Sequence, residues 1–260
     1  MNAELLLRFV LNCDRAYLFA HPERELTPDE HSRYQAALAE RARGVPAQYI
    51  TGHQEFWGMD LIVTPAVLIP RPETEHLIET VLELQASGPA PRTDKLLMAD
   101  VGTGSGCIAL ALAKEFPNAE IHATDSSLQA LEIARANAAR HQLKQRIHFH
   151  HTDLLASLSA PFDFIVSNPP YVGESEEDQV QLEVRKFEPR SAVFGGPTGT
   201  EVIARLIPQA RELLRPGGTL VLEVSGSIAE HVLALLKGWD QPDVIPDLQQ
   251  IARVIRAQRP

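Results

Sequence analysis

The sequence contains few cysteines and no long apolar segment. Only two of its 260 residues are cysteine, and Cys13 and Cys107 lie too far apart along the chain to suggest a metal-binding motif. Such sparse use of cysteine is typical of a reducing compartment, in which thiols stay free. The longest apolar stretch, residues 61–69, is interrupted by Thr64 and Pro65 and is about half as long as a membrane-spanning helix. We therefore expect no association with a membrane.

Positive charge is also scarce. Lysine and arginine contribute 24 residues against 34 aspartates and glutamates, which gives a formal net charge of −10 at pH 7. A surface of this sign repels phosphate and argues against a general nucleic-acid-binding protein. Glu4, Arg8, Asp14 and Arg15 interrupt the first leucines, which argues against a secretory signal peptide. With 44% hydrophobic residues the chain can bury a core, and we expect a soluble cytoplasmic protein.

The pattern before residue 90 is mainly helical. Residues 4–11 are apolar enough for a helix, and the capping box at residues 27–30, with proline at the first helical position, predicts the start of another. Residues 48–69 carry β-branched and aromatic side chains around two glycines, which predicts a hairpin or an extended connector. A further helix is expected at residues 74–86, and the glycine and prolines of residues 87–91 predict a linker.

The remainder of the chain alternates strand-like and helix-like segments. Such alternation predicts a parallel sheet covered by helices on both faces, so we assign the chain to the α/β class. Ser126, with Gln129 three positions later, predicts an N-cap for one of these helices. The expected strands are residues 95–101, 119–124, 146–150, 162–167 and 219–224, and the expected helices are residues 107–116, 128–141 and 201–214.

A glycine-rich loop follows the first of these strands and opens the first helix. It consists of Gly102, Thr103, Gly104, Ser105 and Gly106, directly after Asp100 and Val101. Glycines at such a turn let the backbone approach a ligand closely. The spacing Gly-x-Gly-x-Gly differs from the dinucleotide fingerprint, and the loop lacks the lysine of a phosphate-binding P-loop. The alternative interpretation is a tight turn without a ligand.

Acidic residues follow the next two strands of the predicted sheet. Asp125 ends the second strand, where it is placed to accept hydrogen bonds from the two hydroxyls of a ribose. Asp153 and Leu154 follow the third strand, where the leucine is placed to cover an adenine and the aspartate, or its backbone, to meet the exocyclic amine. A lone aspartate at a strand end is more often only a helix cap, so both interpretations of Asp153 stay open.

The most specific signal is an Asn-Pro-Pro-Tyr tetrapeptide after the strand at residues 162–167. It consists of Asn168, Pro169, Pro170 and Tyr171. Each proline fixes φ and removes an N–H, so the carbonyls of Asn168 and Pro169 have little freedom to move. The side-chain oxygen of Asn168 and the carbonyl of Pro169 can accept both hydrogens of a planar NH₂ group, against which Tyr171 packs. The pattern predicts a site that turns a nitrogen toward an electrophile, with an ordinary turn as the alternative.

Together, these motifs resemble the class I S-adenosylmethionine-dependent methyltransferases that act on planar NH₂ nitrogens. Residues 44–52, 55–58 and 69–75 are similar to the release factor glutamine methyltransferases, the HemK or PrmC family, and the resemblance extends over residues 3–256. Further similarity lies at residues 188–190, 195–196, 214–218 and 222–223. The resemblance implies methylation of the side-chain amide nitrogen (N5) of glutamine in the Gly-Gly-Gln motif of class-1 peptide chain release factors, which act in translation termination.

The resemblance also implies a domain organisation. A small N-terminal helical domain at residues 1–50 would dock the substrate, residues 51–91 would form a β-hairpin connector with a linker helix, and residues 92–260 would form a Rossmann-like methyltransferase domain. Relatives usually carry a helix or two before the position of Met1, so we expect either a truncated docking domain or a misassigned start codon. Residues 225–228 replace the usual glycine and glutamine of the family, and residues 247–253 lack its usual glycine.

Site residues are carried over by position in the motifs. S-adenosylmethionine is the implied cofactor, with Asn168 in contact with both cofactor and substrate. Pro169, Pro170 and Tyr171 would complete the glutamine pocket, and one of Arg71, Pro72, Glu73 and Thr74 would help to close the cofactor cleft. The implied cofactor-binding residues are Gly102, Thr103, Gly104, Ser105, Gly106, Asp125, Asp153, Leu154 and Asn168.

Two other functions remain as alternatives. A methyltransferase acting on adenine N6 or guanine N2 in nucleic acid would use the same tetrapeptide. Glu174, Glu176, Glu177 and Asp178 directly after it argue against a phosphate backbone as partner. The other alternative, a non-enzymatic binding module with a degenerate site, is disfavoured by the intact glycines and tetrapeptide. We expect a monomer with release factors as protein substrates and no nucleic-acid substrate.

Several conspicuous residues are expected to have structural roles. Alternation along a strand places His148 and His150 on one face and His151 on the other, so no metal site is predicted. Cys107 begins a helix, where the pKa of a thiol can fall, but no histidine or second cysteine is near it in the sequence. We expect Cys107 to pack in the core.

Overall fold

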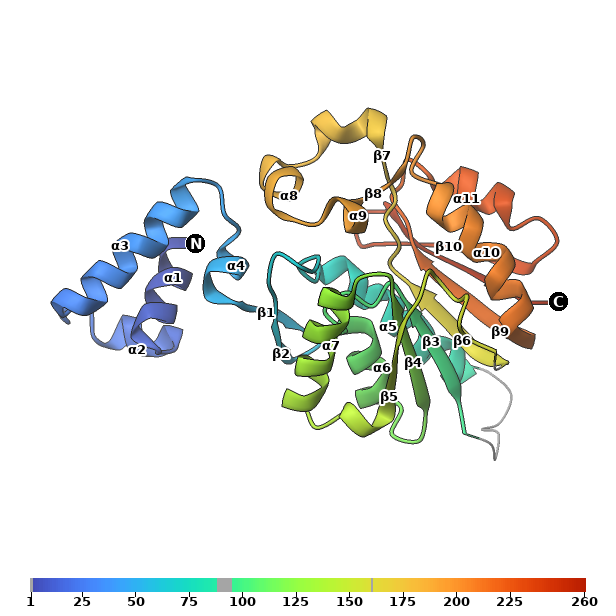
Figure 1. Cartoon of the computed structure of the whole chain (residues 1–260), viewed down its shortest axis with the longest axis horizontal. Coiled ribbons are helices and arrows are strands. Elements are labelled where there is room, and N and C mark those ends of the chain that lie inside the picture. Colours follow the sequence, from blue (N-terminus) through green and yellow to red (C-terminus); the bar gives the residue numbers. More distant parts are fainter. Residues whose placement is uncertain (1, 88–94, 160) are drawn as a thin grey trace.

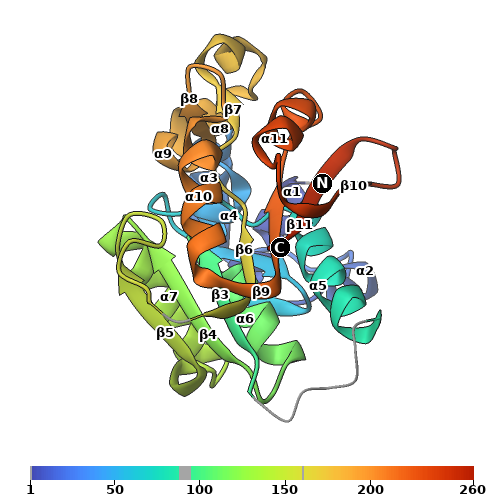
Figure 2. The same ribbon diagram turned by 90° about the vertical axis from the view of Figure 1, so that its right-hand side faces the viewer.

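A central sheet organises the larger part of the chain. The computed structural model describes residues 2–87, 95–159 and 161–260, and within these ranges seven strands form one sheet in the order β10-β11-β9-β6-β3-β4-β5 (Figures 1 and 2). The strands are β3 (Leu97–Val101), β4 (Glu120–Asp125), β5 (Ile147–His151), β6 (Phe162–Ser167), β9 (Leu214–Glu223), β10 (Asp240–Pro246) and β11 (Ala252–Gln258). The predicted linker lies outside the described residues except for Ser87.

The sheet is only partly parallel. Strands β5, β4, β3, β6 and β9 run parallel, as predicted, whereas β11 pairs antiparallel with β9 and β10 pairs antiparallel with β11. The prediction missed both of these antiparallel strands. β10 is largely exposed and contains two aspartates and two prolines, which are depleted in strands. The α/β class and the Rossmann-like fold are confirmed, with this antiparallel extension.

Helices cover both faces of the sheet and enclose two apolar cores. One core lies between the sheet and the helices α5 (Glu75–Ser87), α6 (Cys107–Glu115) and α7 (Leu128–Arg140). The other lies between the opposite face and the helices α10 (Glu201–Leu213) and α11 (Ala229–Leu235). Along β3, Met98 belongs to the first core and its neighbour Ala99 to the second, as strand alternation requires. Because the central strands are buried on both faces, their sequences are continuous apolar runs.

The N-terminal segment is helical and lies to one side of the sheet (Figure 1). Its described helices are α1 (Asn2–Leu11), α2 (Arg15–Ala20), α3 (Pro28–Ala42) and α4 (Ala47–Thr51). The capping box is confirmed: the Thr27 hydroxyl accepts a hydrogen bond from the Glu30 N–H, and the Glu30 carboxylate accepts one from the Thr27 N–H. No helix in the described part of the chain is long and apolar enough to span a bilayer.

One predicted cap is wrong. The N-cap of α7 is Ser127, whose hydroxyl accepts a hydrogen bond from the Ala130 N–H at 3.2 Å, and not Ser126. The reason is the carboxylate of Asp125, which accepts a hydrogen bond from the Ser127 N–H at 2.8 Å and extends the turn by one residue. Side-chain acceptors therefore set where this helix begins.

An irregular insertion connects β6 with α10. It contains a parallel pair of short strands and three short helical segments, of which η3 is a 3₁₀ helix. Two further 3₁₀ helices, η1 (Pro72–Thr74) and η2 (Lys144–Arg146), precede α5 and β5. The insertion comprises β7 (Val172–Gly173), η3 (Glu174–Gln179), α8 (Leu182–Phe187), α9 (Arg190–Val193) and β8 (Phe194–Gly196).

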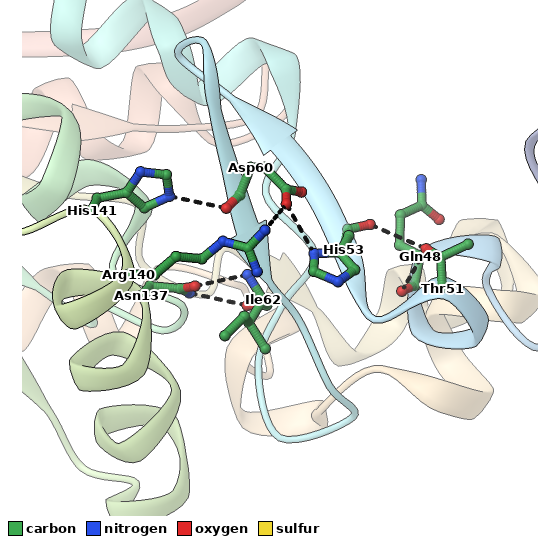
Figure 3. A network of polar contacts seen from close by, with 8 residues as sticks. All are labelled: Gln48, Thr51, His53, Asp60, Ile62, Asn137, Arg140 and His141. Atoms are coloured by element: carbon green, nitrogen blue, oxygen red, sulfur yellow. Dashed lines mark hydrogen bonds and ion pairs between the residues drawn. The ribbon is translucent and has the colours of Figure 1, made fainter. Parts of the chain in front are cut away.

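A hairpin joins the N-terminal helices to the sheet and rests on α7. It consists of β1 (His53–Phe56) and β2 (Met59–Ile62), within the predicted connector. Asn137 on α7 is fully buried and makes a reciprocal pair of hydrogen bonds with Ile62, at 2.7 Å to its N–H and 3.0 Å to its carbonyl (Figure 3). The Asn137 amide also donates to the carbonyl of Ser105 at 2.8 Å. One side chain therefore connects the hairpin, α7 and the glycine-rich loop.

We predict that Asn137→Ala lowers the free energy of unfolding by about 3 kcal/mol, because the buried carbonyl of Ser105 and the partly buried backbone groups of Ile62 lose their partners. Arg140→Ala is a matched control, since it removes an exposed ion pair between the same helix and Asp60 of the same hairpin. The control should cost less than about 1 kcal/mol. Urea unfolding of both variants measures the difference, and equal losses would contradict the prediction.

Candidate active site

A cavity lies at the carboxyl ends of four neighbouring strands of the sheet. Its volume is about 440 Å³, within the range of small-molecule sites. Its walls include residues that follow β3, β4, β5 and β6, which is the edge where parallel sheets bind ligands. Residues 65–68 and part of α10 line it from other directions. The cavity thus brings together the motifs that the sequence singled out.

The glycine-rich loop forms part of this wall. Gly102, Thr103, Gly104 and Ser105 line the cavity, whereas Gly106 is not among its described lining residues. Gly102 and Gly104 have φ values of +73° and +55°, which glycine adopts without strain. The N–H groups of Gly102 and Thr103 both donate to the carbonyl of Thr124, at 2.9 Å each, so the end of β4 supports the loop.

Gly106 has a different role from the other glycines of the loop. Its φ is +86°, and a Cβ at this position would lie 2.7 Å from Leu110 Cδ1 and 3.2 Å from the Cβ of Ala134 on α7. The absence of a side chain therefore allows α6 and α7 to pack closely. Gly106 acts through helix packing, while the rest of the loop faces the cavity.

Asp125 lines the cavity and holds the loop. Its Oδ2 accepts a hydrogen bond from the Gly104 N–H at 2.9 Å, and its Oδ1 accepts one from the Ser127 N–H at 2.8 Å. Each carboxylate oxygen has two lone pairs, so both retain capacity to accept a hydrogen bond from a ligand. The arrangement is compatible with the predicted ribose contact.

Asp100, at the end of β3, supports the loop through hydrogen bonds from within the core. The sequence did not reveal this role. It is fully buried, and its Oδ2 accepts hydrogen bonds from the Thr103 hydroxyl at 2.6 Å and from the Ala109 N–H at 3.1 Å. Burial raises the pKa of Asp100 to about 7. An acidic residue two positions before the first glycine, at the end of the strand, was the available signal.

Asp153 and Leu154 both line the cavity beyond β5. Asp153 forms an ion pair with Arg205 of α10, which also lines the cavity. No helix begins at Asp153 in the described chain, so the helix-cap alternative is not realised. Leu154 has a φ of +50° and is partly buried against the core on the α10 side of the sheet.

The tetrapeptide lies only partly on the cavity wall. Asn168 and Pro170 line it, whereas Pro169 and Tyr171 are not among its described lining residues. The side-chain amide of Asn168 donates to the Thr74 hydroxyl at 3.0 Å, and the Tyr171 hydroxyl donates to Glu223 Oε1 at 3.1 Å. Burial is the main cause that raises the pKa of Tyr171 above its usual range. The tyrosine ring is therefore a packing surface and a neutral hydrogen-bond donor.

The segment at residues 69–74, which precedes α5, also contributes to the cavity wall. Arg71 and Thr74 line it, and Pro72 and Glu73 are not among its described lining residues. The buried carboxylate of Glu188 anchors the segment, because it accepts a hydrogen bond from the Ile69 N–H at 3.0 Å and pairs with Arg71. The family resemblance implied that one of residues 71–74 closes the cleft, but it did not indicate which one.

Cys107 and two histidines of β5 pack against neighbouring side chains. Cys107 is buried, and burial raises the pKa of its thiol to about 12, which supports packing over reactivity. His148 and His150 both contact the ring of His122 on β4. Across the described ranges, no group of three or more His, Cys, Asp or Glu side chains is arranged to hold a metal ion.

Comparison with known proteins decides the family. The family model "PrmC N-terminal domain" matches residues 1–52, and "Methyltransferase small domain" matches residues 82–186. A release factor glutamine methyltransferase of Koribacter versatilis is 56% identical over 100% of this chain and 91% of its own length. The chain belongs to the release factor glutamine methyltransferases. Relatives with the same name from Chlorobaculum tepidum and Coxiella burnetii are 43% and 40% identical, over 97% and 100% of this chain and 88% and 91% of theirs.

Solved structures with lower identity share the fold of this methyltransferase. A Thermus thermophilus 16S rRNA N2 G1207 methyltransferase in complex with AdoMet and guanosine superimposes with a TM-score of 0.58 at 22% identity, covering 80% of this chain and 50% of that one. The N-terminal domain of human METTL16 in complex with SAH gives a TM-score of 0.55 at 18% identity, covering 77% and 76%. These similarities establish the architecture of the methyltransferase domain.

We predict that Gly106→Ala lowers the free energy of unfolding by about 3 kcal/mol, through left-handed strain and overlap with Leu110 and α7. Gly102→Ala is the control, because Gly102 also has a positive φ but a Cβ added there would meet no atom within 4 Å. It should cost about 1 kcal/mol. Thermal and urea unfolding compare the two variants, and an equal loss would show that packing of α6 on α7 does not depend on Gly106.

Proposed function

We propose that this methyltransferase transfers a methyl group from S-adenosylmethionine to the side-chain amide nitrogen (N5) of glutamine in the Gly-Gly-Gln motif of class-1 peptide chain release factors. The observation that carries the proposal is the position of Asn168, whose amide NH₂ group is held by Thr74 at the cavity wall. This contact leaves the side-chain oxygen to accept hydrogen from a substrate amide. The names of the relatives support the same substrate.

The cavity fits the cofactor in size and chemistry. The hydroxyls of Ser105 and Thr124, both residues of the lining, have no hydrogen-bond partner among the described residues. When bound, S-adenosylmethionine would supply an electrophilic methyl group. The residues proposed to hold it are Gly102, Thr103, Gly104, Ser105, Asp125, Asp153, Leu154 and Asn168, with Gly106 contributing through packing.

The proposed role of the tetrapeptide is to orient a weak nucleophile. An amide nitrogen has a delocalised lone pair, so orientation and hydrogen bonding supply much of the rate acceleration. Asn168 Oδ1 and the Pro169 carbonyl would accept the two amide hydrogens, and Pro170 and Tyr171 would keep these acceptors in place. No strong base is needed before transfer, because the nitrogen can lose a proton to water afterwards.

The argument against nucleic acid rests on overall charge more than on the acidic segment. Of the four carboxylates after the tetrapeptide, Glu177 pairs with Arg190 and Asp178 with Arg185, so their negative charge is partly compensated. The net charge of −10 still disfavours a polyanionic substrate. We also propose that the protein is a cytoplasmic monomer.

For the cofactor, we predict that Asp125→Asn weakens S-adenosylmethionine binding by about 1.5–3 kcal/mol, as expected when hydrogen bonds to a charged group are lost. Asn keeps the shape and one acceptor oxygen, so one of the two backbone N–H groups, that of Gly104 or that of Ser127, keeps its acceptor. Isothermal titration calorimetry measures the affinity, with a melting curve to verify folding. Unchanged affinity would remove Asp125 from the cofactor site.

For the substrate, we predict methyl transfer from labelled cofactor to a recombinant release factor and none to its glutamine-to-alanine variant. Asn168→Ala should lower turnover by about 10² or more with cofactor affinity within about tenfold, because the lost acceptor acts on the nucleophile. DNA and ribosomal RNA should not be labelled. Labelling of nucleic acid that does not depend on the glutamine would instead support a nucleic-acid methyltransferase.

A further inference from the structure

A chain of polar side chains extends from the cavity wall to a buried carboxyl group. Asn168 Nδ2 donates to the Thr74 hydroxyl at 3.0 Å, and the Tyr171 hydroxyl donates to Glu223 Oε1 at 3.1 Å. The Thr74 hydroxyl lies close enough to the Glu223 carboxylate to stabilise its charge and lower its pKa. Thr74 is 1% exposed and Glu223 2% exposed, so water does not compete for these contacts. The four residues form what we call the Glu223 network.

The chemistry of these groups determines which of them donate hydrogen bonds and which accept them. A charged carboxylate only accepts hydrogen bonds, so both hydroxyls must point their hydrogens toward Glu223. The oxygen of Thr74 is then available as an acceptor for the Asn168 NH₂ group. With its NH₂ group bound to Thr74, Asn168 turns its side-chain oxygen away from Thr74. A charged Glu223 thereby determines, through one hydroxyl, which end of the Asn168 amide is free.

Several charged groups act on Glu223. Burial is the main cause that raises its pKa, to about 7, and Glu73 of η1 raises it further. Arg253 of β11 and the Tyr171 hydroxyl lower it, and Cys107 of α6 is close enough for the Glu223 charge to affect its thiol. Glu223 Oε2 has no hydrogen-bond partner among the described residues. A protonated Glu223 would become a donor and compete with Asn168 for the Thr74 oxygen.

We propose that Glu223 and Thr74 are positioning residues that orient the Asn168 side-chain amide, so that its oxygen faces the substrate amide. This inference rests on the proposed function, because an NH₂ substrate needs an acceptor at this point. An Asn168 amide rotated by half a turn would present its own NH₂ group to the NH₂ group of the substrate. Two donors would then face each other, and the nitrogen would lose its orientation.

The kinetic test compares two substitutions of one residue. Thr74→Val keeps the shape and removes the hydroxyl, and Thr74→Ser keeps the hydroxyl as a matched control. At saturating cofactor and pH 8, Thr74→Val should lower kcat for a release factor about 10- to 100-fold, with cofactor affinity within about threefold. Thr74→Ser should recover at least about a third of the parental kcat. Equal kcat values for the two variants would overturn the proposal.

The second test uses pH and the charge of Glu223. In the parent enzyme, kcat should rise with pH through about 7, because deprotonation of Glu223 fixes the direction of the network. Glu223→Gln removes the ionisable group, so its kcat should be at least about tenfold lower at pH 8 and should lose this rise. A Glu223→Gln enzyme with the parental pH profile would overturn the proposal even if Thr74→Val did not fold.

A third measurement does not depend on activity. The side-chain NH₂ resonances of Asn168, identified by their absence in Asn168→Ala, should shift with pH near 7 in the parent and not in Glu223→Gln. If the chemical shifts of Asn168 change neither with pH nor with the substitution, the network is contradicted. If the release factor were not methylated but these shifts were seen, the proposed substrate would be wrong while the network would stand.

Discussion

The glycine-rich loop between β3 and α6 depends on carboxylates that accept hydrogen bonds from it. Asp100, at the end of β3, accepts hydrogen bonds from Thr103 and from the start of α6. Asp125, at the end of β4, accepts one from Gly104. Gly102, Gly104 and Gly106 have positive φ values, so the loop cannot satisfy all its N–H groups as a helix or a strand would; the Gly104 N–H donates to a side chain, and those of Gly102 and Thr103 donate to the carbonyl of Thr124. The ends of β3 and β4 supply these acceptors at one edge of the sheet, and the position of the cavity follows from this edge.

The parts of the site that are local in sequence could be predicted. Gly102 to Ser105, Asp125 and Asn168 each directly follow or end a buried strand, and parallel strands bring such positions to one edge. Strand and helix periodicity likewise predicted the α/β class. These predictions needed only patterns a few residues long, because the geometry of parallel strands determines the rest.

Contacts between distant segments could not be predicted in the same way. Thr74 meets Asn168 across 94 positions, and Tyr171 meets Glu223 across 52, with no short pattern linking either pair. Strand β10 was missed because its aspartates and prolines disfavour a strand, and pairing with β11 overrides that preference. Sequence spacing favours Ser126 as the cap, because it does not reveal that Asp125 extends the turn. In each case, tertiary contacts outweigh the local preference.

Asn137 has a consequence beyond the static packing of α7. Its amide holds the carbonyl of Ser105 in the glycine-rich loop and both backbone groups of Ile62 in the hairpin. Opening the hairpin therefore releases one support of the loop, and we expect the two segments to unfold locally as one cooperative unit. A ligand that holds the loop closed would, by thermodynamic linkage, slow amide hydrogen exchange in a hairpin that it never touches.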